Sequence, residues 1–170
     1  MSFALYDFSI ICNIIIFVRD TQTKRKGDSQ MKYLNLINQQ QQELSDFPIM
    51  WAFNDEQFKE GMKRLGLKED ETDKIYSIDG GGFIRRKDAP AFTEMFERHD
   101  RERKEAFQND GFAYDAFLYE LGNHEFCITY EYEPTLSALG ITRKELIADD
   151  SRLMKILKQA KDEYLKGVNY

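Results

Sequence analysis

Residues 73–96, DKIYSIDGGGFIRRKDAPAFTEMF, decide the class of fold. β-forming side chains dominate residues 75–78, and the three glycines that follow, 80–82, suit the positive φ of a tight reversal. Residues 83–87 then form a return strand, and Asp88 is a good N-cap for a helix. The stretch therefore predicts a β-hairpin followed by a helix. A phosphate-binding loop needs a helix directly after its glycines, so this turn does not match one.

The remaining patterns are mostly helical. Helical spacing of apolar residues and capping signals predict helices over 33–45, 55–65, 89–110, 112–121, 134–140 and 152–167. We expect Gly122 and Asn123 to end the fourth of these, and the alternation in residues 125–132 predicts a strand that pairs with the hairpin. The expected fold is α+β: one mostly helical domain, residues 31–170, with an antiparallel sheet of three or four strands.

Residues 1–30 differ from the rest of the chain. The apolar run 3–18 is shorter than the roughly 20 residues that span a bilayer, and the basic residues within 19–26 follow it, whereas a secretory signal has the opposite order. Residues 26–28 can be encoded by a purine-rich ribosome-binding sequence just before Met31. We therefore expect residues 1–30 to be translated upstream sequence, with Met31 as the start. The alternative is a short membrane anchor with its basic side facing the cytoplasm.

Composition limits the classes of function. The chain has 170 residues and a formal net charge of -6, which argues against general nucleic-acid binding because that requires a basic face. Its two cysteines, Cys12 and Cys127, form no C-x-x-C pair, so neither a disulfide framework nor a zinc finger is indicated. This usage fits a reducing, cytoplasmic compartment.

Chemically capable side chains concentrate in residues 114–125. The candidate functional cluster consists of Tyr114, Asp115, Tyr119, Glu120, Asn123, His124 and Glu125, with Arg85 and Arg86 from the hairpin. Glu120 and His124 are four residues apart, but the expected helix end lies between them. His99 lies on an apolar helical stripe, where a histidine is usually packed. With only two histidines, a site of three or more metal ligands is disfavoured, and we predict no catalytic residue, metal site or cofactor.

Three segments together carry a resemblance to a known family. They are FNDEQFKEGMKRLGL (53–67), DKIYSIDGGGFIRRKDAPAF (73–92) and FAYDAFLYELGNHEF (112–126). The combination resembles a family of small uncharacterised proteins found in bacteriophages and mobile elements of gut and related bacteria. The resemblance spans Met31 to about the last helix. It implies a genomic setting but no established activity and no catalytic residues.

Two hypotheses about function follow. The favoured one is a non-enzymatic accessory protein of a phage or mobile element that binds a host or phage protein. Tyrosines 114, 119, 130 and 132 could form its exposed anchor patch. The alternative is a small enzyme, or a nucleotide- or metal-binding protein, that uses residues 114–125. A pocket that brings His124 together with Glu120 or Asp115 and with Arg85 or Arg86 would favour the alternative.

Overall fold

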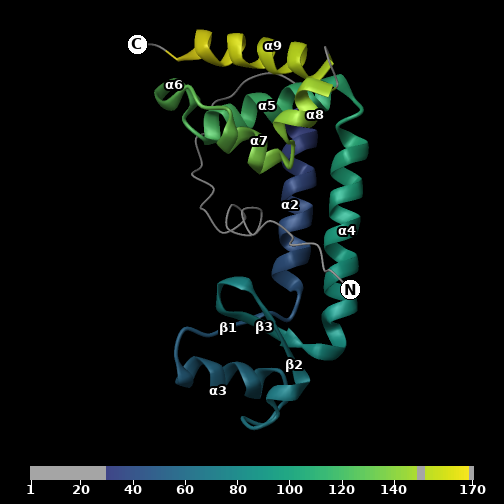
Figure 1. Ribbon diagram of the computed structural model, residues 1–170, viewed down its shortest axis with the longest axis vertical. Helices are drawn as coiled ribbons and strands as arrows, with labels where there is room; N and C mark the ends of the chain where they lie inside the picture. Colours follow the sequence, from purple (N-terminus) through teal and green to yellow (C-terminus); the bar gives the residue numbers. More distant parts are fainter. Residues whose placement is uncertain (1–29, 149–151, 169–170) are drawn as a thin grey trace. The chain divides into compact units, whose positions relative to one another are not determined.

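The computed structural model describes residues 30–148 and 152–168, and these are mostly helical with one small sheet (Figure 1). The helices are α2 (Gln30–Asp46), α3 (Asp55–Arg64), α4 (Ala89–Ala106), α5 (Asp110–Asn123), α6 (Phe126–Thr129), α7 (Glu133–Leu139), α8 (Arg143–Ala148) and α9 (Arg152–Gly167). The strands are β1 (Met50–Trp51), β2 (Ile75–Ile78) and β3 (Gly82–Arg85), all antiparallel in the order β1-β3-β2. The expected α+β class and the hairpin are confirmed.

The chain divides into two compact units. We call Asn38–Arg103 the sheet unit, and the described residues up to Ile37 and from Lys104 onward the helical unit. Residues 1–29 lie outside the described residues, so the expectations for an upstream leader or an anchor stay predictions. Among the described residues, no helix is long and apolar enough to cross a membrane.

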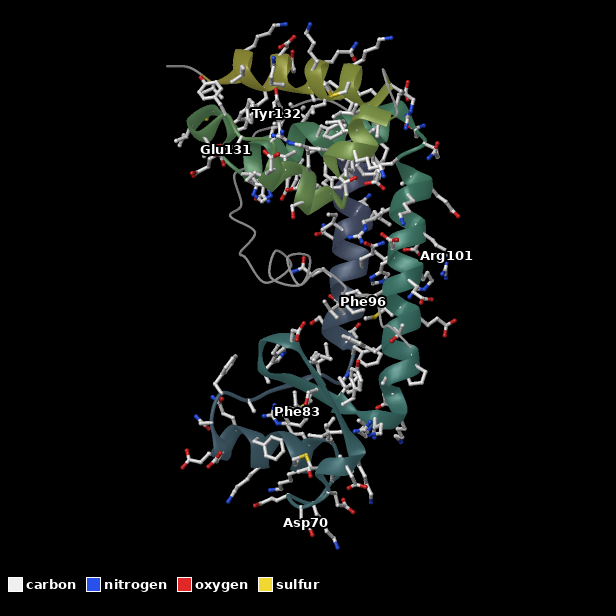
Figure 2. The ribbon with its side chains drawn as sticks, viewed as in Figure 1. Asp70, Phe83, Phe96, Arg101, Glu131 and Tyr132 are labelled. Carbon is white, nitrogen blue, oxygen red and sulfur yellow. The ribbon has the colours of Figure 1, made fainter. Side chains whose placement is uncertain are left out.

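The sheet unit packs helices on both faces of its sheet. The pairing of Ser77 with Phe83, and of Ile78 with Gly82, fixes which side chains share a face. On one face Phe83 packs with Met62 and Leu65 near α3 (Figure 2). On the other face the core consists of Ile84, Phe92 and Met95, with the partly buried Leu44, Phe47, Ile49, Ile78, Ala89 and Phe96 around it. Burial on both faces stabilises the short strands.

Local capping signals behave as expected in the sheet unit. The side chain of Asn54 accepts a hydrogen bond from the Gln57 amide at 2.8 Å, and Gln57 Oε1 accepts one from the Phe53 amide at 2.7 Å. This capping box begins α3 directly after the sheet's first strand. The orientation of Phe53 is thereby tied to the start of a helix.

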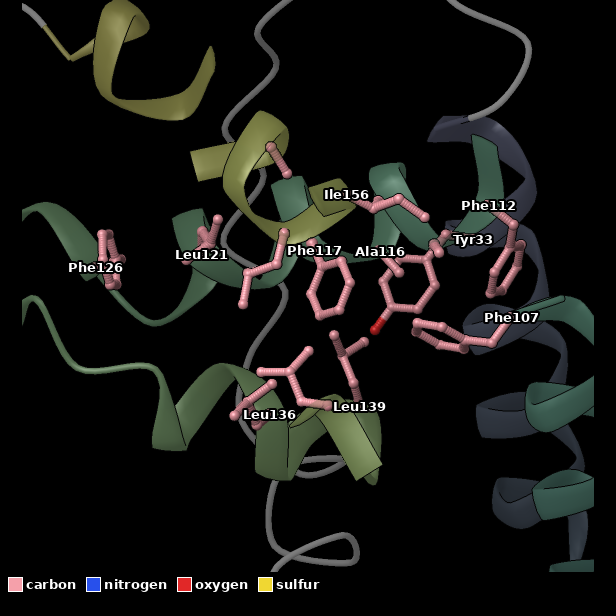
Figure 3. Packing of buried hydrophobic residues seen from close by; sticks show 14 residues of the cluster. Tyr33, Phe107, Phe112, Ala116, Phe117, Leu121, Phe126, Leu136, Leu139 and Ile156 are labelled. Atoms are coloured by element: carbon pink, nitrogen blue, oxygen red, sulfur yellow. The ribbon is translucent and has the colours of Figure 1, made fainter. Parts of the chain in front are cut away.

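The helical unit is built around α5, which packs against α6, α7 and α9. Its core includes Ala116, Phe117 and Leu121 from α5 and Ile156 from α9. Figure 3 shows the ring of Tyr33 close to the aromatic rings of the same cluster, and the Tyr33 ring centroid lies 5.7 Å from that of Phe112. The helical unit therefore has one continuous apolar core.

The structure corrects two expectations for this unit. Helix α5 ends at Asn123, as expected, but Gly122 and Asn123 still belong to it and do not separate Glu120 from His124, whose amide donates to the Glu120 carbonyl. The expected strand over 125–132 is absent, since residues 126–129 form the short helix α6. Glu125 and Tyr130 flank α6 in the left-handed region, with φ of 50° and 55°. Such a conformation ends regular structure at both residues, so an extended strand cannot form here.

Candidate functional site

The end of α5 brings together two residues that the sequence analysis separated. Because the helix runs unbroken to Asn123, Glu120 and His124 share one face, and His124 Nε2 lies 3.4 Å from Glu120 Oε2. The Glu120 side chain is almost fully buried, whereas 18% of the His124 side chain is exposed. The pair therefore connects the interior of the helical unit with its surface.

The Glu120 carboxylate is held by donors from two helices. Tyr33, on α2, donates its hydroxyl hydrogen to Glu120 Oε1 at 2.5 Å. Asn123 Nδ2 donates to the other oxygen, Oε2, at 3.0 Å. On α7, the buried Thr135 donates its hydroxyl to the backbone carbonyl of Glu120 at 3.4 Å. Sequence analysis missed Tyr33 because it lies 87 residues away in the chain.

This geometry suits a structural polar network better than a catalytic one. Both oxygens of Glu120 accept hydrogen bonds, and a general base needs an oxygen that can reach a substrate proton. The buried Nε2 of His124 makes no hydrogen bond within the described part of the chain. Burial raises the pKa of Tyr119, and the neighbouring Glu120 carboxylate raises it further. Both effects disfavour the phenolate form of Tyr119.

The other predicted members of the 114–125 segment do not complete a reactive constellation. Asp115 is buried in α5, and Glu125 is exposed at the left-handed residue before α6. Burial raises the pKa of Tyr114, with further contributions from the carboxylates of Glu163 and Asp115. Among residues 30–148 and 152–168, no group of three or more histidine, cysteine or acidic side chains could hold a metal ion.

The two predicted arginines belong to the sheet unit, whereas residues 114–125 belong to the helical unit. Arg85 Nε lies 2.7 Å from Asp88 Oδ2, and Arg86 Nε donates to the backbone carbonyl of Asp73 at 2.7 Å. Both guanidinium groups thus bind partners close to the hairpin. These hydrogen bonds connect the end of the hairpin to the turns on either side of it.

His99 is buried in a second polar network, within the sheet unit. Its Nε2 lies 2.8 Å from Glu43 Oε2, and Arg98 contacts the other oxygen of Glu43. Gln40 donates to the His99 carbonyl at 3.2 Å and to Glu102 at 3.0 Å. His99 is packed in the interior, as its position on the apolar stripe of the helix predicts. Its Nε2 atom is hydrogen-bonded to Glu43 of α2.

Among the residues that the structure describes, the most exposed aromatic side chain lies against the glycine turn. Phe53 is 77% exposed and Trp51 is 36% exposed. A Cβ added at Gly81 would lie 3.5 Å from the Phe53 ring, and one added at Gly82 would lie 3.0 Å from the Trp51 ring. The two rings therefore lie against the turn glycines. We call Trp51 and Phe53, with these glycines, the aromatic surface.

Sequence analysis did not find this surface. The predicted anchor patch consisted of four tyrosines instead. Of those four, only Tyr130 is exposed, at 59%. The sequence holds only a partial signal: Trp51, where strand β1 ends, and Phe53 alternate just before the N-cap Asn54.

The fold and these sites define a class: a mostly helical α+β protein with buried polar networks and exposed aromatic side chains against a glycine turn. Residues 32–163 match a family of unknown function, DUF7659, and the chain belongs to this family. A search of curated proteins finds no match, and neither does a search of solved structures.

Proposed function

We propose that this protein is a non-enzymatic accessory protein of a bacteriophage or mobile element that binds a host or phage protein through its aromatic surface. The observation that carries the proposal is the exposure of Phe53, at 77%, with its ring and that of Trp51 lying against the glycines of the hairpin turn. The phage or mobile-element setting comes from the resemblance of the three sequence segments. The expected place of action is the cytoplasm.

Burial of these rings would supply binding energy. Fully burying one large apolar side chain contributes roughly 1.5–3 kcal/mol, and tryptophan is enriched among residues that dominate interfaces. Backbone hydrogen bonds also hold the segment that carries both rings against the turn. The Ala52 amide donates to the Gly81 carbonyl at 3.0 Å, and the Phe53 amide donates to Gln57. Little conformational entropy is therefore lost when a partner covers them.

The charges near the aromatic surface indicate the chemistry of the partner. Asp55 and Glu56 lie in the first turn of α3, directly after Phe53, and Asp79 belongs to the glycine turn. All three are exposed and make no hydrogen bond or ion pair through their side chains within the described residues. A fitting partner is a protein with an apolar pocket surrounded by lysine or arginine.

The enzymatic alternative finds less support in the geometry. Its best pair, Glu120 and His124, has a carboxylate whose two oxygens already accept hydrogen bonds from Tyr33 and Asn123. Arg85 and Arg86 bind Asp88 and the Asp73 carbonyl within the sheet unit. Binding to another protein requires exposed side chains such as these aromatic ones, and it does not require the polar groups of Glu120, His124, Arg85 and Arg86.

A pull-down from a bacterial host lysate tests the proposal. The full chain and its Phe53→Ala variant serve as bait, and an Ile128→Ala variant is the matched control because Ile128 is 70% exposed in the helical unit. We expect one protein retained near equal stoichiometry by the wild type and by the control, and reduced at least about tenfold by Phe53→Ala. Equal retention by all three baits would overturn the proposal.

A further inference from the structure

A second surface, of opposite charge, lies on the helical unit. Helix α9 buries Ile156, Leu157 and Ala160 in the core. Its opposite side carries the exposed Lys155 and Lys158, and Figure 2 shows nitrogen-tipped side chains standing away from α9 on the side that does not face α5. The helix holds five basic residues and two acidic ones in a chain of net charge -6. This surface therefore differs in sign from the protein as a whole.

Several of these cations have no internal partner. Within residues 30–148 and 152–168, the side chains of Lys144, Lys155, Lys158 and Lys166 make no hydrogen bond or ion pair. Lys161, in contrast, pairs with Asp162 at 3.1 Å. Unpaired, exposed ammonium groups on one helix side repel one another weakly and attract anions.

Exposed apolar side chains accompany the lysines. Met154 is 46% exposed on α9, and Ile147 is 66% exposed on α8, which packs against α9. Lys144 lies three residues before Ile147, on the same side of α8. We call Lys144, Ile147, Met154, Lys155 and Lys158 the basic surface. Cations mixed with apolar groups fit a ligand that has both carboxylates and an apolar side chain.

The same region lacks the donors that favour phosphates. Arginine forks match phosphate oxygens in pairs, whereas lysine acts as a point charge. The two arginines of α8 and α9 are used internally. Arg143 contacts Glu133, and Arg152 binds Asp110 at 2.6 Å and the Phe107 carbonyl at 2.8 Å. A nucleic-acid backbone would meet lysines alone and would gain little from Ile147 and Met154.

We propose that the basic surface of α8 and α9 binds an acidic segment of a partner protein, with an apolar side chain of that segment packed on Met154 and Ile147. This goes beyond the proposed function, because it assigns a second binding surface with a different ligand. The aromatic surface takes a cationic partner and the basic surface takes an anionic one. The protein would then connect two partners.

An NMR titration of the full chain tests this assignment. The probe is a synthetic twelve-residue peptide of glutamate with two leucines. We expect amide shifts concentrated in residues 143–148 and 152–167, and affinity that falls as salt rises. Lys155→Glu with Lys158→Glu should weaken binding at least tenfold. The matched control, Lys63→Glu with Lys87→Glu, changes the net charge equally on exposed lysines of the sheet unit and should leave the affinity within twofold.

Two further measurements separate this proposal from simple charge attraction. Met154→Ser should lower the affinity for the leucine-containing peptide severalfold but leave the affinity for an all-glutamate peptide unchanged. A single-stranded twelve-nucleotide DNA should bind more weakly than the peptide. In the NMR titration, the absence of binding, or amide shifts spread over both units, would overturn the proposal. Equal losses of peptide affinity in the two double variants would also overturn it. So would an unchanged affinity of Met154→Ser for the leucine-containing peptide, or tighter binding of the DNA than of the peptide.

Discussion

The hydroxyl of Tyr33 lies 2.5 Å from a carboxylate oxygen of Glu120, although the two residues are 87 positions apart in the chain. Both side chains are buried in the helical unit. A buried carboxylate is tolerated only when its oxygens are hydrogen-bonded, because charge is otherwise costly to remove from water. This contact therefore ties α2 to α5 and couples their stability.

Tyr33→Phe removes that donor and leaves Glu120 Oε1 without it. We expect the free energy of unfolding to fall by about 1.5–3 kcal/mol, the range for hydrogen bonds to charged groups. Urea unfolding followed by circular dichroism measures it. Tyr119→Phe is the matched control, because the Tyr119 hydroxyl makes no hydrogen bond within the described residues. Equal losses in the two variants would contradict this account of Glu120.

The Glu43 network predicts a dependence of stability on pH. Hydrogen bonds from His99 and Arg98 hold the pKa of Glu43 below its ordinary value of 4.5. The unfolded chain keeps the ordinary value, so the stabilisation is present above pH 4.5 and is lost as pH falls through the folded-state pKa.

Glu43→Gln removes this titration. Between pH ~6 and pH ~3, the wild type should lose more free energy of unfolding than Glu43→Gln does. Other carboxyls with lowered pKa, such as Glu71 and Glu133, contribute equally to both proteins and cancel in the difference. Parallel curves for the two proteins over this range would show that the contact between Glu43 and His99 does not stabilise the fold.

Gly82→Ala should disturb the aromatic surface. A Cβ there would lie 2.6 Å from Ile78 Cγ1 and 3.0 Å from the Trp51 ring, so both side chains must shift. We expect a loss of about 1–3 kcal/mol and a changed emission spectrum from Trp51, the only tryptophan in the chain.

Gly66→Ala provides the contrast to that variant. Gly66 has φ of +71° with nothing within 4 Å of an added Cβ, so its cost of about 1 kcal/mol comes from backbone strain alone. The folded-state emission of Trp51 should not change. A Gly82→Ala protein with wild-type emission would mean that the ring does not rest on the turn.

Sequence patterns predicted the parts of the fold that depend on neighbouring residues. The glycine turn and the helix-capping signals are local and form as expected: the side chains of Asn54 and Thr142 each accept a hydrogen bond from the amide three residues further on. The prediction of a strand over 125–132 was wrong because it rested on local alternation alone. The left-handed backbone conformations of Glu125 and Tyr130 depend on packing in the helical unit. Such tertiary effects override a short pattern.

The candidate site shows the same limit. Glu120 and His124 were singled out, but Tyr33, which binds Glu120, is remote in sequence and carries no motif. The exposure of Phe53 does not follow from the alternation of Trp51 and Phe53 alone. An aromatic residue before a helix is usually buried, and only the position of the glycine turn reveals that this one lies at the surface.

Asn54→Ala tests the support of the aromatic surface. Loss of the N-cap bond to the Gln57 amide should lower the free energy of unfolding by about 1 kcal/mol. Asn35→Ala, an exposed position inside α2, should stay within about 0.5 kcal/mol of the wild type. Thermal unfolding by calorimetry compares them. If Asn54→Ala matched Asn35→Ala, the cap would contribute nothing to stability.

Photo-crosslinking at position 53 in host cells tests the central claim most directly. A Phe53→p-benzoylphenylalanine variant places the reactive group on the aromatic surface, and the same substitution at Ile128 is the control at a similarly exposed site of the helical unit. We predict one discrete covalent adduct with a single protein from position 53, lost when Trp51→Ala is added, and none from position 128. No adduct from position 53, or the same adducts from both positions, would contradict the account.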